Sequence, residues 1–163
     1  MKPLNQYIQE KLIINKDYNQ YTYAPKSFDE LRRIIEDRYD KLGAGTEQNP
    51  IDFNDIDVSN LNSFFNEYKG IFEGTKFKYI DISDWDVSNA TNMTYMFYKC
   101  DELKSVGDIS GWDVSNVISM TSMFDGCKSF NQDISNWNVS NVRHYEFMFY
   151  NCPIKEEYKP KFK

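Results

Sequence analysis

Three cysteines recur at nearly regular intervals in this chain of 163 residues, and cysteine is the residue type best suited to metal or redox chemistry. Cys100, Cys127 and Cys152 lie 27 and 25 residues apart, whereas structural zinc sites use cysteine pairs roughly two to four residues apart. An odd number of cysteines cannot all pair within one chain, which favours a reducing compartment over a disulfide framework. We therefore predict that the thiols are small buried core groups and that the chain binds no metal and no cofactor.

Aspartates recur as regularly as the cysteines. The phrase Asp-Ile-Ser-x-Trp-(Asp/Asn)-Val-Ser-Asn begins at Asp81, at Asp108 and at Asp133. Stacked carboxylates repel one another unless a cation or local hydrogen bonds offset their charge. No EF-hand-like loop is present, so we predict that backbone N–H groups of local turns satisfy the carboxylates. The outward positions would then form an acidic face that either is structural or attracts a basic partner by charge, with Asp84, Asp86 and Asp113 as candidate binding residues.

No set of residues in the sequence has the types needed for catalysis. His144 is the only histidine, and neither a Ser/His/Asp set nor a paired-carboxylate pocket can be assembled around it. The segment 42–45, Leu-Gly-Ala-Gly, is typical of a helix end and not of a phosphate-binding loop. We predict that the protein is not an enzyme; the alternative is a small enzyme that uses the acidic face.

The elements that must position these residues are internal repeats. In the copy after Asp81, Ile82, Trp85 and Val87 predict a short strand, and Ser-Asn predicts a corner. The following apolar residues have helical spacing: Ala90, Met93, Met96, Phe97 and Cys100. A degenerate copy begins at Asp52 with an offset of 29, in which Ile71 takes the place of Cys100 and Tyr68 that of Phe97. The sequence thus predicts an α/β fold, a short leucine-rich-repeat-like solenoid of about four strand-turn-helix coils with a parallel sheet, capped by an N-terminal helix.

The ends of the chain have patterns of their own. Ser27 and Glu30 form a capping box and Gly43 a stop signal, which predicts a helix over 27–42. Residues 3–14 predict a weaker amphipathic helix that serves either as a further cap or as a docking segment. We therefore divide the chain into an N-terminal helical segment and cap (1–48), the four repeats (49–152) and a C-terminal capping tail (153–163).

The repeated phrase, with its Trp, Val-Ser-Asn, Met-x-x-Met-Phe and Cys, resembles the BspA-like leucine-rich-repeat surface protein family and its mycoplasma-type lipoprotein repeats. The resemblance covers residues 51–152 and implies a solenoid that acts in adhesion or surface display. The first fourteen residues also resemble the N-termini of some gut bacteriophage proteins, which implies a phage-encoded protein.

Composition and surface pattern narrow the function. A net charge of −6 and a pI of about 4.8 argue against nucleic-acid binding. The sequence has no membrane span, signal peptide or lipobox, so a cytoplasmic or virion-associated location is expected. Aromatic residues that vary between copies either anchor a protein partner or pack against the capping segments and one another: Tyr95, Tyr98, Phe147 and Tyr150. We predict a non-enzymatic protein–protein interaction module or structural component; the alternative is a bacterial surface adhesin or lipoprotein-type repeat protein.

Overall fold

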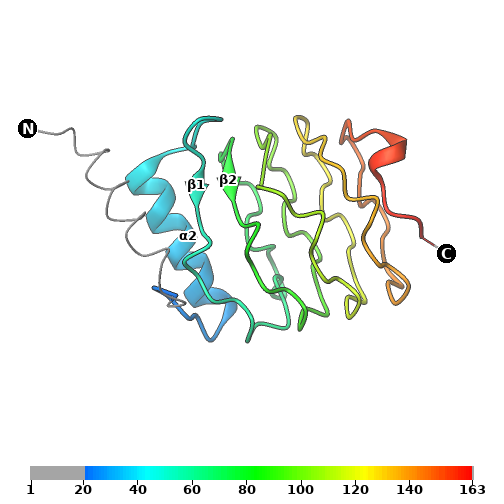
Figure 1. Ribbon diagram of the computed structural model, residues 1–163, viewed down its shortest axis with the longest axis horizontal. Coiled ribbons are helices and arrows are strands. Elements are labelled where there is room, and N and C mark those ends of the chain that lie inside the picture. The colour runs from blue at the N-terminus through cyan, green and yellow to red at the C-terminus, as the bar shows by residue number, and fades with distance from the viewer. Residues whose placement is uncertain (1–20, 163) are drawn as a thin grey trace, which may run out of the picture.

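The computed structural model describes residues 21–162. Figure 1 shows successive chain segments lying side by side in a row, with a helix across the end of the row nearer the N-terminus. The elements are helix α2 (Phe28–Leu42), strand β1 (Ile51–Asp52), strand β2 (Ile80–Asp81) and the 3-10 helix η2 (Glu156–Tyr158). Strands β1 and β2 pair in parallel, with Ile51 opposite Ile80. The predicted helix over 3–14 lies outside the described residues.

The predicted α/β solenoid of four strand-turn-helix coils is wrong. Among residues 21–162 the structure has one α-helix, α2, and one small two-stranded parallel sheet that is not closed. The repeat segments consist of consecutive turns joined by isolated bridges. No α-helix occurs in any repeat that the structure describes, and the strands do not extend into a sheet of four.

The spacing of the apolar residues was misleading because it fits successive β-turns as well as a helix. In both, residues three apart in sequence come close to one another. Met96 N–H donates to Met93 O at 3.2 Å, and Cys100 N–H donates to Phe97 O at 3.0 Å. Such i to i+3 hydrogen bonds close successive turns. Tyr95 has a φ of 55°, in the left-handed region that interrupts a right-handed helix. Apolar side chains therefore face inward at intervals of three or four residues without a helix.

Backbone hydrogen bonds join each repeat to the next. Met93 N–H donates to Ser119 O at 2.9 Å, and Met120 N–H donates to His144 O at 2.7 Å. We call the turn-rich segments 70–75, 93–100, 120–127 and 145–152 layers 1 to 4. In layers 2 and 3, alternate N–H groups donate to carbonyls of the next layer. Each layer thus has an N–H edge that faces the C-terminal end of the row.

Aromatic rings form the core along this row. Phe72, Phe97 and Phe124 are fully buried and stack in sequence, with centroids 5.4 and 5.2 Å apart. The tryptophans of the repeated phrase also link neighbouring repeats. Trp85 Nε1–H donates to Phe53 O at 2.9 Å, and Trp137 Nε1–H makes the equivalent bond to the third repeat. Burial of these rings supplies the apolar contact area that the short elements cannot supply alone.

The predicted helix over 27–42 is confirmed. Ser27 is the N-cap of α2, and its Oγ accepts from Glu30 N–H at 3.2 Å. Gly43 ends the helix with a φ of 75°. Leu31 and Ile35 are fully buried against the core. The local sequence was sufficient because both ends of this helix have strong signals.

The first repeat aligns differently from the prediction. Phe72 N–H donates to Met96 O at 2.9 Å, so Phe72 is the neighbour of Phe97, and their rings stack. Thr75 Oγ1 lies 3.6 Å from Cys100 Sγ. The predicted equivalence of Ile71 with Cys100 is therefore wrong, because Thr75 occupies the position of the cysteine.

A four-residue hairpin over 66–69 causes this shift. Phe65 and Gly70 form an antiparallel bridge, and Asn66 N–H donates to Lys69 O at 3.0 Å. Tyr68 at its tip is 85% exposed, so the predicted equivalence of Tyr68 with the buried Phe97 is also wrong. The offset between the first two repeats is 29 before the hairpin (Ser63 opposite Asn92) and 25 after it (Thr75 beside Cys100).

Candidate binding surfaces

The cysteines form a buried column that is partly polar. Cys100 Sγ donates to Phe72 O at 3.0 Å, and Cys127 Sγ donates to Phe97 O at 3.0 Å. Burial raises the pKa of Cys100 to about 12 and also raises that of Cys127. Since the thiolate is the reactive and metal-binding form, these thiols are inert at neutral pH. They contribute to packing and to hydrogen bonding between layers.

Thiol labelling tests this column. Cys152 is only partly buried, whereas Cys100 and Cys127 are fully buried. In the native protein we expect a thiol reagent at pH 7.5 to label Cys152 first, with the other two roughly 100-fold slower because they require local opening. Mass spectrometry of timed samples gives the three rates, and unfolded protein is the control in which all three should react alike. Equal rates in the native protein would contradict the buried column.

The aspartates of the repeated phrase lie in local turns, as predicted. Asp86 Oδ1 accepts from Ser88 N–H at 3.0 Å and from Ser88 Oγ–H at 2.7 Å. Asp113 Oδ1 accepts from Ser115 N–H at 3.0 Å, and hydrogen bonds from Ser115 lower the pKa of that carboxyl. A lowered folded-state pKa means that the turn adds stability at neutral pH, which is lost as acid titrates the carboxylate. Asx-turns with a serine two residues on also occur at Asp57, Asp81, Asp108 and Asp133.

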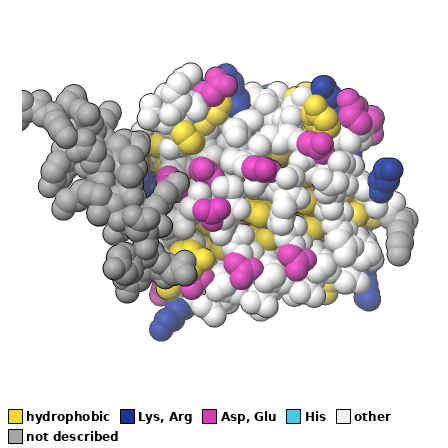
Figure 2. Space-filling view, in the orientation of Figure 1, with side chains coloured by type: hydrophobic (Ala, Val, Ile, Leu, Met, Phe, Trp, Pro, Cys, Tyr) yellow, Lys and Arg dark blue, Asp and Glu magenta, His cyan; other side chains and the backbone are white. Residues whose placement is uncertain are grey.

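The acidic face is a surface and not a pocket. Asp84, Asp86 and Asp113 are all exposed. Figure 2 shows acidic side chains spread over one face, with the visible Lys and Arg side chains at its periphery. Within residues 21–162 no group of three or more His, Cys, Asp or Glu is placed to hold a metal ion. The face can therefore act through its charge, but its carboxylates do not converge.

The four predicted aromatic anchors form two pairs. The rings of Tyr95 and Tyr98 lie 5.0 Å apart in layer 2, and those of Phe147 and Tyr150 lie 6.1 Å apart in layer 4. Phe147 is 67% exposed and Tyr150 is 58% exposed, whereas the layer 2 pair is half-buried. We call these four residues the aromatic surface.

The backbone beneath the aromatic surface is in an unfavourable conformation for large side chains. Tyr95 and Phe147 occupy equivalent positions and have φ values of 55° and 57°. A non-glycine residue in the left-handed region costs about 1–2 kcal/mol. The equivalent residue in layer 3 is the small Ser122, with a φ of 50°. The chain thus places bulky aromatic residues where glycine would be least strained.

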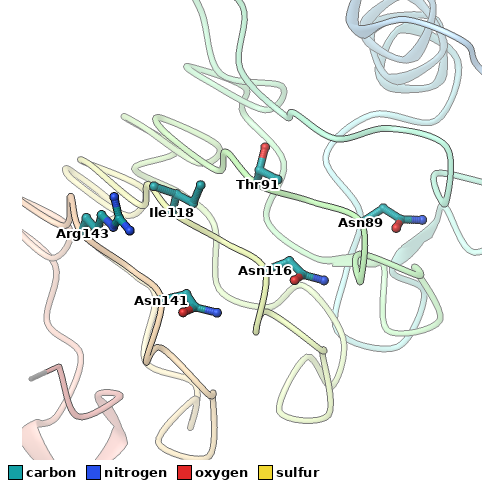
Figure 3. A pocket seen from close by; sticks show the side chains of 6 residues that line it. All are labelled: Asn89, Thr91, Asn116, Ile118, Asn141 and Arg143. Atoms are coloured by element: carbon teal, nitrogen blue, oxygen red, sulfur yellow. The ribbon is translucent and has the colours of Figure 1, made fainter.

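An open groove of about 470 Å³ lies between two rows of side chains. This groove was not predicted from the sequence. Figure 3 shows the amides of Asn89, Asn116 and Asn141 pointing the same way in one row. Each donates its Nδ2–H to a serine carbonyl of the preceding repeat, at 2.7 to 2.9 Å. The second row contains Thr91, Ile118 and Arg143.

The second row of the groove could have been detected from the sequence. Thr91, Ile118 and Arg143 come two residues after the repeated asparagine, and they differ in every copy. Variation at one position between otherwise uniform copies is the signal, but the prediction placed these positions within a helical segment and did not select them as candidate residues. The groove holds amide and hydroxyl groups with a single cation, and it has no group that could act as a nucleophile with a partner base.

The chain was also compared with known proteins. A family model with the description "Mycoplasma protein of unknown function, DUF285" matches residues 59–158, which is more than half of the sequence. Neither the curated proteins nor the solved structures include a significant match. In the part of the chain that the structure describes, no helix is long and apolar enough to cross a membrane.

Proposed function

Because the chain belongs to the family described as Mycoplasma protein of unknown function, DUF285, whose description leaves the activity open, we propose a function from the surfaces themselves. We infer a non-enzymatic protein–protein interaction module that binds its partner through the aromatic surface. The acidic face would contribute long-range attraction to a basic region of the same partner.

The placement of Tyr95 and Phe147 carries this proposal. Both are aromatic residues with φ near 55°, and glycine would relieve the strain at either position. Phe147 is also mostly exposed, so core packing gives no compensation for the strain. Exposed aromatic side chains are the commonest anchors of protein interfaces. A role in binding accounts for a residue type that neither the backbone nor the core requires.

Substitution of the aromatic surface tests the proposal. We expect a variant with Tyr95, Tyr98, Phe147 and Tyr150 all changed to Ala to remain folded, because none of the four is fully buried. Loss of one interface anchor typically costs about 2 kcal/mol or more, which corresponds to roughly 30-fold weaker binding. Affinity purification from the source cells, followed by titration of the recovered partner against both proteins, measures the loss.

A matched set on the acidic face serves as the control. Asp84→Asn, Asp86→Asn and Asp113→Asn together remove charge from exposed positions. This variant should slow association at low salt and leave the dissociation rate nearly unchanged. A partner that binds the aromatic variant as tightly as the parent protein, but is lost from the acidic variant, would contradict the proposal.

Surface display is a second candidate, favoured by the resemblance of the repeats to BspA-like surface proteins and by the family's mycoplasma description. On this proposal the aromatic surface would face the medium and bind a protein of a host or neighbouring cell. Protease shaving of intact cells distinguishes the two: a displayed protein is digested, whereas one inside the cell is protected. If the protein is phage-encoded, we expect to find it in purified virions instead. Its gene would then lie among genes of phage type.

A further inference from the structure

Layer 4 ends the row with an open hydrogen-bonding edge. In layer 3, four alternate N–H groups donate at 2.7 to 3.0 Å to carbonyls of layer 4 and of His144 just before it: Met120, Ser122, Phe124 and Gly126. The equivalent groups in layer 4 make no hydrogen bond within the described residues: Tyr145, Phe147, Phe149 and Asn151. The structure therefore presents four parallel donors in a register that each interior layer already satisfies with carbonyls of the next turn-rich segment.

The C-terminal tail covers the other part of the last repeat and leaves this edge open. Tyr158 O accepts from Ile134 N–H at 3.0 Å, so the tail takes the place of a further repeat beside residue 134. At layer 4 the tail contributes side chains only. The Phe162 ring stacks on Tyr145 with centroids 4.1 Å apart, and Lys159 Nζ lies 5.6 Å from the centre of the Phe149 ring. The apolar rings are thus shielded, while the backbone donors beside them have no acceptor among residues 21–162.

The opposite end of the row is closed. Arg32 of α2 donates to Ile71 O at 2.6 Å and lies 3.4 to 3.5 Å from the carbonyl oxygens of Gly70 and Glu73. The carbonyls of layer 1 are therefore already occupied. A second copy of the chain cannot offer them to layer 4, and two layer 4 edges would place donors against donors. Self-association through this edge is disfavoured at both ends of the molecule.

We propose that the layer 4 edge captures a segment of a partner protein that adopts the turn conformation of an interior layer, lies parallel to residues 143–151 and presents alternate backbone carbonyls to the four N–H groups. As in strand addition to an exposed edge, main-chain hydrogen bonds supply the affinity. Unprotected edges of this kind are normally covered, charged or interrupted by proline. Here Glu146 is the only acidic residue in layer 4, and the layer contains no proline, since Pro153 comes directly after it.

The inference rests on the proposed function of protein binding and adds to it the form of the ligand. The exposed Phe147 and Tyr150 belong to the same layer as the open edge. A bound segment would therefore have aromatic side chains beside it, and these would contact whatever side chains it presents outward.

A peptide of known geometry provides the probe. Residues 118–126 of this chain present the four carbonyls that layer 2 donates to: Ser119, Thr121, Met123 and Asp125. We expect this peptide, with blocked ends, to slow amide hydrogen exchange of the four edge groups by roughly tenfold or more at saturation. The amides of Met93, Tyr95, Phe97 and Lys99 are internal controls, because they are already bonded in the free protein. NMR resolves each amide separately.

Three results would overturn the inference. The peptide could fail to bind at the highest soluble concentration, or it could bind without protecting the four amides. The protein alone could also dimerise with those amides protected, which would make a second copy the occupant.

The variant Tyr95→Ala with Tyr98→Ala separates this test from that of the proposed function. In this variant the peptide should still protect the four edge amides, whereas the affinity for the cellular partner should fall. If the amides are protected and the affinity for the partner is unchanged, only the proposed function is refuted.

Discussion

Gly70→Ala is expected to destabilise the protein by about 3 kcal/mol or more, one of the largest effects of any single-methyl addition in this chain. A Cβ at Gly70 would lie 1.8 Å from the carbonyl oxygen of Tyr95 and 2.3 Å from its carbonyl carbon. Both are backbone atoms of layer 2, so no side-chain rotation can relieve the contact. The two layers would have to separate, which would weaken the ring stacking of Phe72 on Phe97.

Gly111→Ala is the matched control, because a Cβ there has nothing within 4 Å. Its expected effect on the free energy of unfolding is within about 0.5 kcal/mol of the parent. Urea denaturation followed by circular dichroism measures both variants. Equal midpoints for the two alanines would show that layers 1 and 2 are not in the close contact described above.

Arg32→Ala is expected to destabilise the protein by about 2–4 kcal/mol. The Arg32 side chain is only 12% exposed, and its guanidinium donates to Ile71 O at 2.6 Å and to Glu36 at 2.7 Å. Alanine would leave the part-buried carbonyl oxygens of Ile71 and Glu73 at the end of layer 1 without their donor. Arg32→Lys should recover part of the loss, since an ammonium supplies fewer donors in a less suitable geometry.

Arg33 is the neighbouring control on the same helix. It is exposed, and its Nε–H makes one long contact of 3.4 Å to Asp29 O. Arg33→Ala removes the same charge and the same side-chain type, yet it should change the free energy of unfolding by no more than about 0.5 kcal/mol. If thermal melts show equal losses for the two alanine variants, then net charge or helix propensity, and not capping of layer 1, is responsible.

The parts of the fold that were predictable are those with local chemical signals. The helix α2 was predicted because Ser27, Glu30 and Gly43 mark both of its ends. The Asx-turns were predicted because Asp followed by Ser two residues on favours hydrogen bonds to the nearby backbone. In both cases a few adjacent residues determine the conformation, so no knowledge of distant contacts is needed.

The repeat architecture was not predictable in the same way. Successive four-residue β-turns and helices of 3.6 residues per turn bury nearly the same positions over a short segment. The deciding feature is the left-handed backbone, which the sequence hardly indicates because Tyr95 and Lys99 adopt it in layer 2. The residue types that favour this region occur only at the equivalents of Lys99, which are Gly74, Gly126 and Asn151.

The candidate site was partly predictable. The residues of the aromatic surface were selected because they differ between copies, and the structure places them in two exposed or half-exposed pairs. The groove was missed because its variable row lies in segments for which a helix was predicted, and a helix would not have placed these side chains in one row beside the asparagines. The open edge of layer 4 could not be inferred, since backbone donors have no sequence signal and their partners are known only once the layers are aligned.

The hairpin over 66–69 shows how such a chain can change its outline. Four residues enter between Phe65 and Gly70, yet Thr75 is again beside Cys100 within a few residues. The extra length is accommodated entirely at the surface, and the buried rings keep their spacing. New loops of other sizes could replace this hairpin without any compensating change in the interior, so the protein's exterior can diversify while its core remains the same.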